Sequence, residues 1–106
     1  MNFKVFRTEM FKEELEKQPR IEQERIKRFE RHLSDNPFAG KPLGLVFFRE
    51  KKLNGRRVYY LVYEEFIVVL MVGISNKKNQ QAKIDYIKTR LPEYYGIIKE
   101  SITKLS

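Results

Sequence analysis

The chain contains no cysteine and a single histidine, His32. Without cysteine it can form no disulfide framework, no thiolate nucleophile and no cysteine metal site. With one histidine it has no His/Cys metal cluster, and any Ser-His-Asp arrangement would have to use His32. No neighbouring motif gives His32 a catalytic task, so we expect it at the surface or boundary of a helix.

Long apolar runs are also missing. The longest, Phe66 to Ile74, has the length of a buried strand and falls well short of the roughly 18 to 20 residues that span a membrane. The N-terminus lacks a hydrophobic signal core behind a basic stretch, and the five glycines are too scattered for a phosphate-binding loop. We therefore expect a cytoplasmic protein with no membrane partner, no metal and no cofactor.

The composition is that of one folded domain over residues 1–106. A chain of 106 residues is long enough for one hydrophobic core and too short for two ordinary domains. Its hydrophobic fraction of 42% and charged fraction of 34% are typical of a folded protein rather than a disordered one.

Positive charge is in excess and is concentrated in the second half of the chain. The net charge is +8; residues 1–40 carry nine Lys/Arg against eight Asp/Glu, and residues 41–106 carry thirteen against six. Residues 41–57 alone hold six cations and one acid, and residues 77–90 hold five and one. Such clustering is expected of a protein that binds a polyanion, with a solvated lysine-rich surface as the alternative.

The first part of the chain predicts a strand and two helices. Period-two alternation over residues 3–5 indicates a short strand, and a helix should follow from Thr8, a suitable cap, to about Gln18. Pro19 suits the first turn of a second helix, which should end at the turn formers of residues 34–37 and pack against the first as a hairpin. Its apolar residues recur at helical spacing: Ile26, Phe29 and Leu33.

Three strands and a helical C-terminus should follow. Residues 45–53 and 56–63 flank Asn54-Gly55, the strongest hairpin signal in the chain, and residues 66–75 form an apolar run expected of a central strand covered on both faces. Beyond a polar loop, apolar residues recur at helical spacing on both sides of Pro92, which indicates one kinked helix or two helices that meet there. The order β-α-α-β-β-β-α predicts an α+β fold with a small, mainly antiparallel, four-stranded sheet.

The predicted hairpin is rich in cations. Period-two alternation places Arg49 and Lys51 on one face of its first strand, and Glu50 and Lys52 on the other. Two further cations, either of which can lie near Lys51 or Lys52, open the second strand: Arg56 and Arg57. Like charges on neighbouring strands repel each other, which indicates that an anion binds there.

A second cationic segment follows the central strand. Lys77 and Lys78 lie just beyond its end, and the next helix begins near Gln80, so the N-terminus of that helix adds a favourable partial positive charge. If this segment converges with the hairpin, the combined cations can hold a phosphodiester.

Cleavage of RNA without a metal needs a base for the 2′-hydroxyl proton, cations that stabilise the charge developing on the phosphate, and a donor for the leaving oxygen. A lysine can be the base when neighbouring cations lower its pKa, and Lys51 is our candidate. We assign charge stabilisation to Arg49, Arg57 and either Lys77 or Lys78. The same basic hairpin would also suit a protein that binds RNA without cutting it.

Aromatic and further basic residues accompany this set. Tyr59, Tyr60 and Tyr63 fall in one strand and are expected to pack in the core. Tyr86 is the candidate for stacking on an RNA base, although it could equally cover the core. The remaining candidates for RNA contact are Lys41, Lys52, Arg56 and Lys83.

Several motifs stand in an order that is more specific than any one of them. They are Asn36-Pro37, Gly40-Lys41-Pro42-Leu43, the strand from Arg49 to Leu53, Gly55-Arg56-Arg57, Tyr60-Leu61-Val62-Tyr63, and Lys77-Lys78 after a hydrophobic strand. Together with the order of strands and helices, they make nearly the whole chain resemble the RelE/ParE superfamily of toxins from toxin–antitoxin systems.

The resemblance implies roles for particular residues. RNA-cleaving members carry basic residues two apart in the corresponding strand, a basic residue after the last strand, and often a C-terminal tyrosine. The matching residues here are Arg49 and Lys51, Lys77 or Lys78, and Tyr86. These members commonly have an arginine where this chain has Tyr60; Arg57 can replace it only if a bulge or a shifted register turns it toward Lys51.

The resemblance also implies an activity and a partner. It implies a RelE-like mRNA interferase, a metal-independent endoribonuclease that cleaves ribosome-bound messenger RNA and so inhibits translation. It further implies a cognate antitoxin, for which an acidic, amphipathic protein would complement the basic half of the chain. Two alternatives stay open: a ParE-like toxin that poisons DNA gyrase, and a noncatalytic RNA-binding domain on the same fold. The converging basic residues favour the nuclease.

Overall fold

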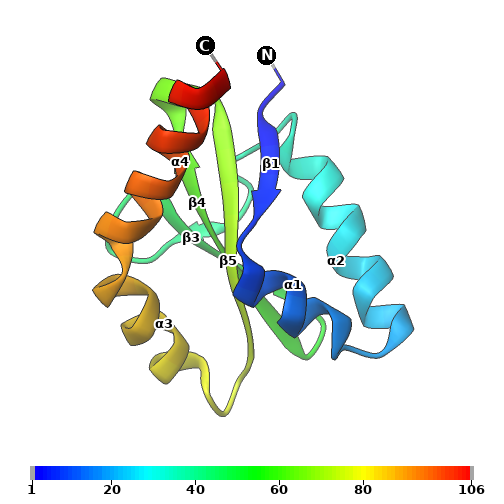
Figure 1. Cartoon of the computed structure of the whole chain (residues 1–106). Helices are drawn as coiled ribbons and strands as arrows, with labels where there is room; N and C mark the ends of the chain where they lie inside the picture. The colour runs from blue at the N-terminus through cyan, green and yellow to red at the C-terminus, as the bar shows by residue number, and fades with distance from the viewer. Residues whose placement is uncertain (1, 106) are drawn as a thin grey trace.

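A five-stranded sheet forms the centre of the structure (Figure 1). Its strands are β1 (Lys4–Arg7), β2 (Lys41–Pro42), β3 (Phe48–Leu53), β4 (Arg56–Tyr63) and β5 (Val68–Asn76). In the computed structural model, which describes residues 2–105, the strand order is β1-β5-β4-β3-β2. Strand β1 runs parallel to β5, and all other neighbours are antiparallel.

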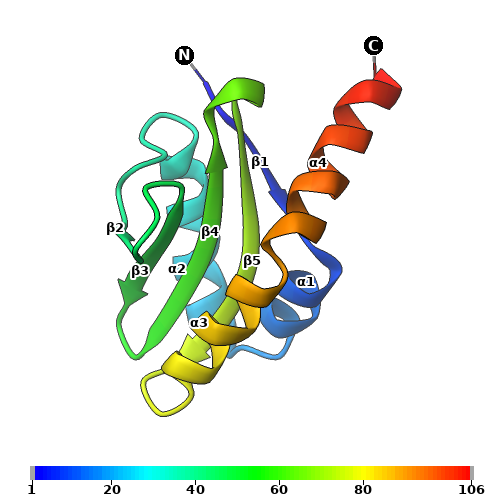
Figure 2. The ribbon, with the colours of Figure 1, turned by 90° about the vertical axis from the view of Figure 1, so that its left-hand side faces the viewer.

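Helices cover both faces of this sheet. They are α1 (Glu9–Glu16), α2 (Arg20–Leu33), α3 (Gln80–Thr89) and α4 (Leu91–Leu105). Helices α1 and α2 lie on one face, and α3 and α4 lie on the other (Figures 1 and 2). Each face has its own apolar core, and residues 68–75 of β5 are buried between them, so the predicted central strand with two covered faces is confirmed.

The two N-terminal helices form for the local reasons that the sequence indicates. The Thr8 hydroxyl accepts a hydrogen bond from Phe11 N at 3.1 Å and so caps the start of α1. Helix α1 ends at Glu16, slightly before the predicted end, and Pro19 is the N-cap of α2 rather than a residue of its first turn. The predicted apolar stripe of α2 is buried in the first core: Ile26, Phe29 and Leu33.

The sheet has one strand more than the predicted four, because the connection before β3 pairs with it. Lys41 and Pro42 form β2 opposite Glu50 and Arg49. Gly40 makes this approach possible, since a Cβ there would stand 2.5 Å from the Glu50 carbonyl oxygen. Strand β3 accordingly begins at Phe48 and not at residue 45, because residues 45–47 turn before it.

The hairpin and the C-terminal helices also match the sequence pattern. Asn54 has a positive φ of 59°, as the Asn-Gly turn between β3 and β4 requires. The C-terminal segment forms two helices rather than one kinked helix, and Pro92 lies in the first turn of the second. No helix in the described part of the chain is both long and apolar enough to cross a membrane.

Candidate functional site

The cations of β3 point to the two faces predicted from their alternation, and this separates them. Arg49 and Lys51 lie on the face covered by α2. The Arg49 guanidinium donates to the Gly40 carbonyl at 2.7 and 3.0 Å and lies 5.1 Å from the Phe38 ring centroid. The Lys51 ammonium lies 5.9 Å from the Phe29 ring centroid. Arg49 therefore holds the loop before β3, and both cations sit beside aromatic rings of that face.

Arg57 lies on the opposite face of the sheet, which is covered by α3. Its partner across the ladder is Lys52, and Tyr60 pairs with Arg49 without any shift of register between β3 and β4. The irregularity at Tyr59/Tyr60 concerns the pairing of β4 with β5. Arg57 is therefore not turned toward Lys51 by a bulge, and the structure does not gather the full predicted set of Arg49, Lys51, Arg57 and Lys77 or Lys78 around one point.

What the structure does assemble is a cleft of about 390 Å³ on the α3 side of the hairpin. Residues from the loop before β2, from β2, β3 and β4, and from the start of α3 surround it. They are Ala39, Gly40, Lys41, Glu50, Lys51, Lys52, Arg57 and Gln80. Four predicted cations, Lys41, Lys51, Lys52 and Arg57, thus meet Glu50 and Gln80, two residues to which the sequence pattern assigned no task.

The Arg57 guanidinium is the unusual group in this cleft. Arg57 is 8% exposed, yet among residues 2–105 its guanidinium donates no hydrogen bond and forms no ion pair. Its nitrogen atoms remain accessible to solvent. Among the described residues, the side-chain atoms that are fully buried and have no hydrogen-bond partner are Glu22 Oε2 and Tyr63 Oη, and no nitrogen of Arg57 is one of them. Burying a charge without a partner is costly. A guanidinium held open in a cleft is a ready binding site for a carboxylate or phosphate.

Glu50 supplies a carboxylate beside this guanidinium. It is 5% exposed and accepts a hydrogen bond from Gln80 Nε2 at 2.7 Å, while Lys41 Nζ lies 4.0 Å from its other oxygen. The position of Glu50 could have been predicted from the sequence. Alternation places Glu50 on the same face as Lys52, and the register of the hairpin places Arg57 opposite Lys52 on that face. The contact with Gln80 carries no sequence signal, since it joins residues thirty positions apart.

Two hydroxyl groups belong to residues that pair with Glu50 and Arg57 in the sheet. Tyr59 pairs with Glu50 across the ladder, and its hydroxyl lies 2.8 Å from Ser75 Oγ. Burial raises the pKa of Tyr59 to about 12, with the Ser75 hydrogen bond acting in the opposite direction. Tyr59 is therefore neutral at physiological pH, and the charge of the cleft comes from its cations and Glu50.

The remaining predicted residues lie outside this cleft. Lys77 and Lys78 are exposed in the turn between β5 and α3. Lys83 forms an ion pair with Glu14, and Arg56 donates to Gln18 Oε1 at 2.7 Å. Tyr86 is half-buried against the second core, with the Arg90 guanidinium 4.9 Å from its ring centroid.

A larger groove of about 590 Å³ lies along β1 and α2. Its Arg7 side chain already binds both oxygens of the Glu30 carboxylate, at 2.6 and 2.8 Å. We favour the smaller cleft as the functional site, because its buried guanidinium is left free for a ligand. Within residues 2–105 no group of three His, Cys, Asp or Glu side chains is arranged to hold a metal ion.

Solved structures that are similar to this chain include RelE toxins. A mutant of the E. coli toxin RelE in the free state has a TM-score of 0.75 at 21% identity, covering 86% of this chain and 99% of that one. The RelBE2 toxin–antitoxin complex from Mycobacterium tuberculosis gives 0.65 at 22% identity, covering 73% and 100%. The RelE–RelB complex from Pyrococcus horikoshii gives 0.64 at 19% identity, covering 73% and 97%. No family model matches the chain, and no curated protein matches it in sequence.

Proposed function

We propose that this chain, which has the fold of the RelE toxins, is the toxin of a toxin–antitoxin pair and an endoribonuclease that cleaves ribosome-bound messenger RNA. The observation that carries the proposal is the open Arg57 guanidinium, 8% exposed, in a cleft that also holds Lys41 and Lys52. A cleft with one free guanidinium and the ammonium groups of two exposed lysines suits a phosphodiester. A ribosomal target implies that the protein acts in the cytoplasm.

The groups in the cleft can divide the chemistry of metal-free RNA cleavage. Glu50 takes the proton of the 2′-hydroxyl, the 2′-oxygen attacks phosphorus, and the bond from phosphorus to the 5′-oxygen breaks. Arg57 stabilises the negative charge that builds up on the phosphate, a contribution of about 3 kcal/mol for a well-placed donor. The Lys41 or Lys52 ammonium gives a proton to the leaving oxygen. The products are a 2′,3′-cyclic phosphate and a 5′-hydroxyl.

In this proposed mechanism the base is Glu50, whereas the sequence pattern predicted the neighbouring Lys51. Glu50 and Lys51 are adjacent in β3 and point to opposite faces of the sheet. Glu50 shares its face with Arg57, whereas the Lys51 ammonium lies over the Phe29 ring. A base has to reach the proton that it removes, so position favours Glu50 before pKa is considered.

An antitoxin is the second part of the proposal. The M. tuberculosis and P. horikoshii structures are complexes of a RelE toxin with its RelB antitoxin. The cations of residues 41–106 outnumber the acids by seven in this chain, and an acidic, amphipathic partner that covers the cleft would neutralise them.

The test compares neighbouring substitutions on the two faces of β3. Each variant is induced in cells, and the 5′ ends of messenger RNA are mapped. We expect cuts within translated frames for the wild type, a loss of about a hundredfold or more for Glu50→Gln and Arg57→Gln, and a much smaller loss for Lys51→Gln. Circular dichroism confirms that each variant is folded.

Other outcomes identify the other functions. Cuts that depend on Lys51 and not on Glu50 would restore Lys51 as the base. Toxicity without any cuts, retained in Glu50→Gln and accompanied by broken DNA, would indicate a gyrase poison. Binding of RNA that is neither toxic nor followed by cleavage would indicate a noncatalytic RNA-binding domain.

A further inference from the structure

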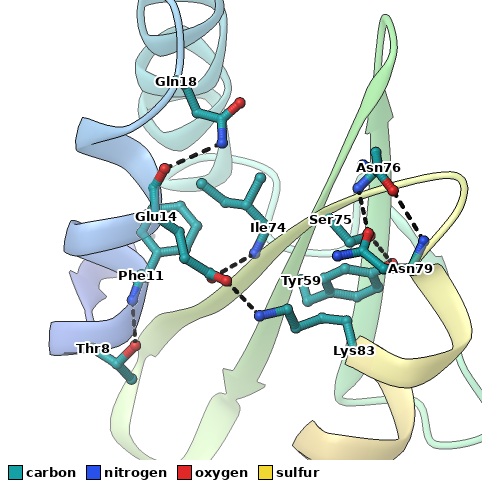
Figure 3. Close-up of polar contacts among 10 residues, drawn as sticks. All are labelled: Thr8, Phe11, Glu14, Gln18, Tyr59, Ile74, Ser75, Asn76, Asn79 and Lys83. Carbon is teal, nitrogen blue, oxygen red and sulfur yellow. Dashed lines mark hydrogen bonds and ion pairs between the residues drawn. The ribbon is translucent and has the colours of Figure 1, made fainter.

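Glu14 of α1 joins three elements, because its carboxylate contacts Ile74 of β5 and Lys83 of α3 (Figure 3). Strand β1 leaves β5 at Thr8, whose N–H donates to the Met71 carbonyl, while β5 continues to Asn76. Beyond that point β5 has no strand on its β1 side. The Glu14 carboxylate takes the place of the missing strand, because its Oε1 accepts from Ile74 N at 3.0 Å.

The other oxygen of Glu14 pairs with Lys83 of α3. The Lys83 side chain is only 14% exposed and passes directly over Gly73 of β5. A Cβ at Gly73 would stand 3.1 Å from Lys83 Cδ, so the absence of a side chain there gives the lysine its path. One carboxylate on α1 therefore holds both the end of β5 and the first turns of α3.

Helix α3 contributes a residue to the cleft, and β5 pairs with the strand that carries Arg57. Gln80 stands one turn before Lys83 on α3, and its amide donates to Glu50 Oε2 at 2.7 Å. Ser75 follows Ile74 on β5 and pairs with Arg57 of β4, and its hydroxyl lies 2.8 Å from that of Tyr59. Helix α3 has no side-chain cap at its N-terminus; reciprocal bonds between Asn76 and Asn79 tie its start to the end of β5, and the contacts of Gln80 and Lys83 then set how its first turns pack on the sheet.

The position of Glu50 decides whether Arg57 is free. Arg57 pairs with Lys52, and Glu50 lies two residues before Lys52 on the same face, so Glu50 and Arg57 are diagonal neighbours within reach of each other. Among the described residues they nevertheless form no ion pair, because Glu50 bonds to Gln80 and lies near Lys41 instead. If Gln80 moved away, Glu50 could turn to Arg57 and occupy it.

We propose that Glu14 is a positioning residue for the cleft: through Lys83 it holds the start of α3 where Gln80 retains Glu50, and it thereby keeps Arg57 open for a phosphate. The inference rests on the proposed function, since the phosphate is that of RNA. Loss of this contact frees α3 at its start, Glu50 pairs with Arg57, and the affinity of the cleft for a phosphodiester falls while the fold persists.

Binding of an uncleavable RNA tests this positioning role. The probe is a short, fluorescently labelled RNA with 2′-O-methyl groups, which cannot supply the attacking hydroxyl. Glu14→Gln keeps an oxygen for Ile74 N but removes the charge that holds Lys83, and we expect about tenfold weaker binding. Glu13→Gln, an exposed neighbour on α1, is the matched control and should bind like the wild type.

Repeating the Glu14→Gln substitution in the Glu50→Gln variant distinguishes a positioning role of Glu14 from a general loss of stability. In Glu50→Gln no carboxylate is left to occupy Arg57, so adding Glu14→Gln should change the affinity less than twofold. A substitution that merely loosens the fold would lower the melting temperature without this difference between backgrounds. Equal weakening in both backgrounds, or no weakening in either, would overturn the proposal.

The Arg57→Gln variant shows whether a negative result refutes only the positioning role of Glu14 or also the proposed function of the cleft. If Arg57→Gln binds the RNA as tightly as the wild type does, the cleft is not a phosphate site and the proposed function fails with it. If Arg57→Gln loses binding while Glu14→Gln keeps it in both backgrounds, only the positioning role of Glu14 is wrong.

Discussion

Tyr60 and Tyr63 on β4 are both buried, but only one of their hydroxyl groups has a hydrogen-bond partner among the described residues. The Tyr60 hydroxyl accepts a hydrogen bond from the N–H of Gly40 at 2.8 Å. The Tyr63 hydroxyl is buried with no hydrogen-bond partner among residues 2–105. Burial raises the pKa of both, so both are protonated at neutral pH. Tyr→Phe removes the same oxygen at each position, and we expect opposite results.

The magnitudes follow from what each substitution leaves behind. Tyr60→Phe leaves the Gly40 N–H unpaired in a place so tight that a Cβ on Gly40 would lie 2.8 Å from the Tyr60 hydroxyl. An unsatisfied buried donor costs about 1–3 kcal/mol in the free energy of unfolding, and each kcal/mol lowers the melting temperature of a chain of this size by about 4–8 °C. Tyr63→Phe removes an unpaired hydroxyl, so its stability should stay the same or rise by up to about 1 kcal/mol.

Urea unfolding at neutral pH measures both changes. The midpoint should fall for Tyr60→Phe and stay or rise for Tyr63→Phe, with the dependence on urea concentration unchanged in both. Equal losses for the two variants would show that the bond to Gly40 does not account for the stability of Tyr60. A larger loss for Tyr63→Phe would show that its hydroxyl has a partner after all.

Three further outcomes are expected. Burial raises the pKa of Tyr59 from 10.0 to about 12, so its contribution to stability is complete below pH 10 and is lost as the pH rises toward 12; urea midpoints across this window should decline less steeply in Tyr59→Phe. Gly96 is exposed in α4 with no atom near an added Cβ, so Gly96→Ala should raise the melting temperature by an amount that matches about 0.5–1 kcal/mol, and a decrease would contradict this. Arg7→Met leaves the buried Glu30 carboxylate without its partner and should cost about 3 kcal/mol, seen as a lower urea midpoint, whereas Arg7→Met/Glu30→Met should recover part of it.

The elements of the fold could be predicted because their causes are local. The cap at Thr8, the apolar stripe of α2, the Asn54-Gly55 turn and the break before Pro92 each depend on residues within a few positions of one another. Strand β2 could not be predicted in this way. It exists because Gly40 lets the chain approach the Glu50 carbonyl, and nothing within a few residues of Lys41 indicates that approach.

The candidate site could likewise be predicted only in part, because some of its features are local and others depend on how the helices pack. Alternation correctly placed Arg49 and Lys51 on one face and Glu50 and Lys52 on the other. It could not indicate which face would be closed by aromatic rings and which would open into a cleft, because that depends on α2 and α3. The proposed function therefore takes Glu50 as the candidate base in place of Lys51, its neighbour on the other face of the sheet.

The sequence by itself determined the order of the elements, the two faces of the hairpin strand and the excess of positive charge, since each is a property of short stretches of chain. Only the tertiary structure decided that Arg57 stays free and that Lys83 does not. Those two outcomes depend on contacts from Gln80 to Glu50 and from Glu14 to Lys83, between residues 30 and 69 positions apart. No local pattern records such contacts, because they exist only once the helices have packed on the sheet.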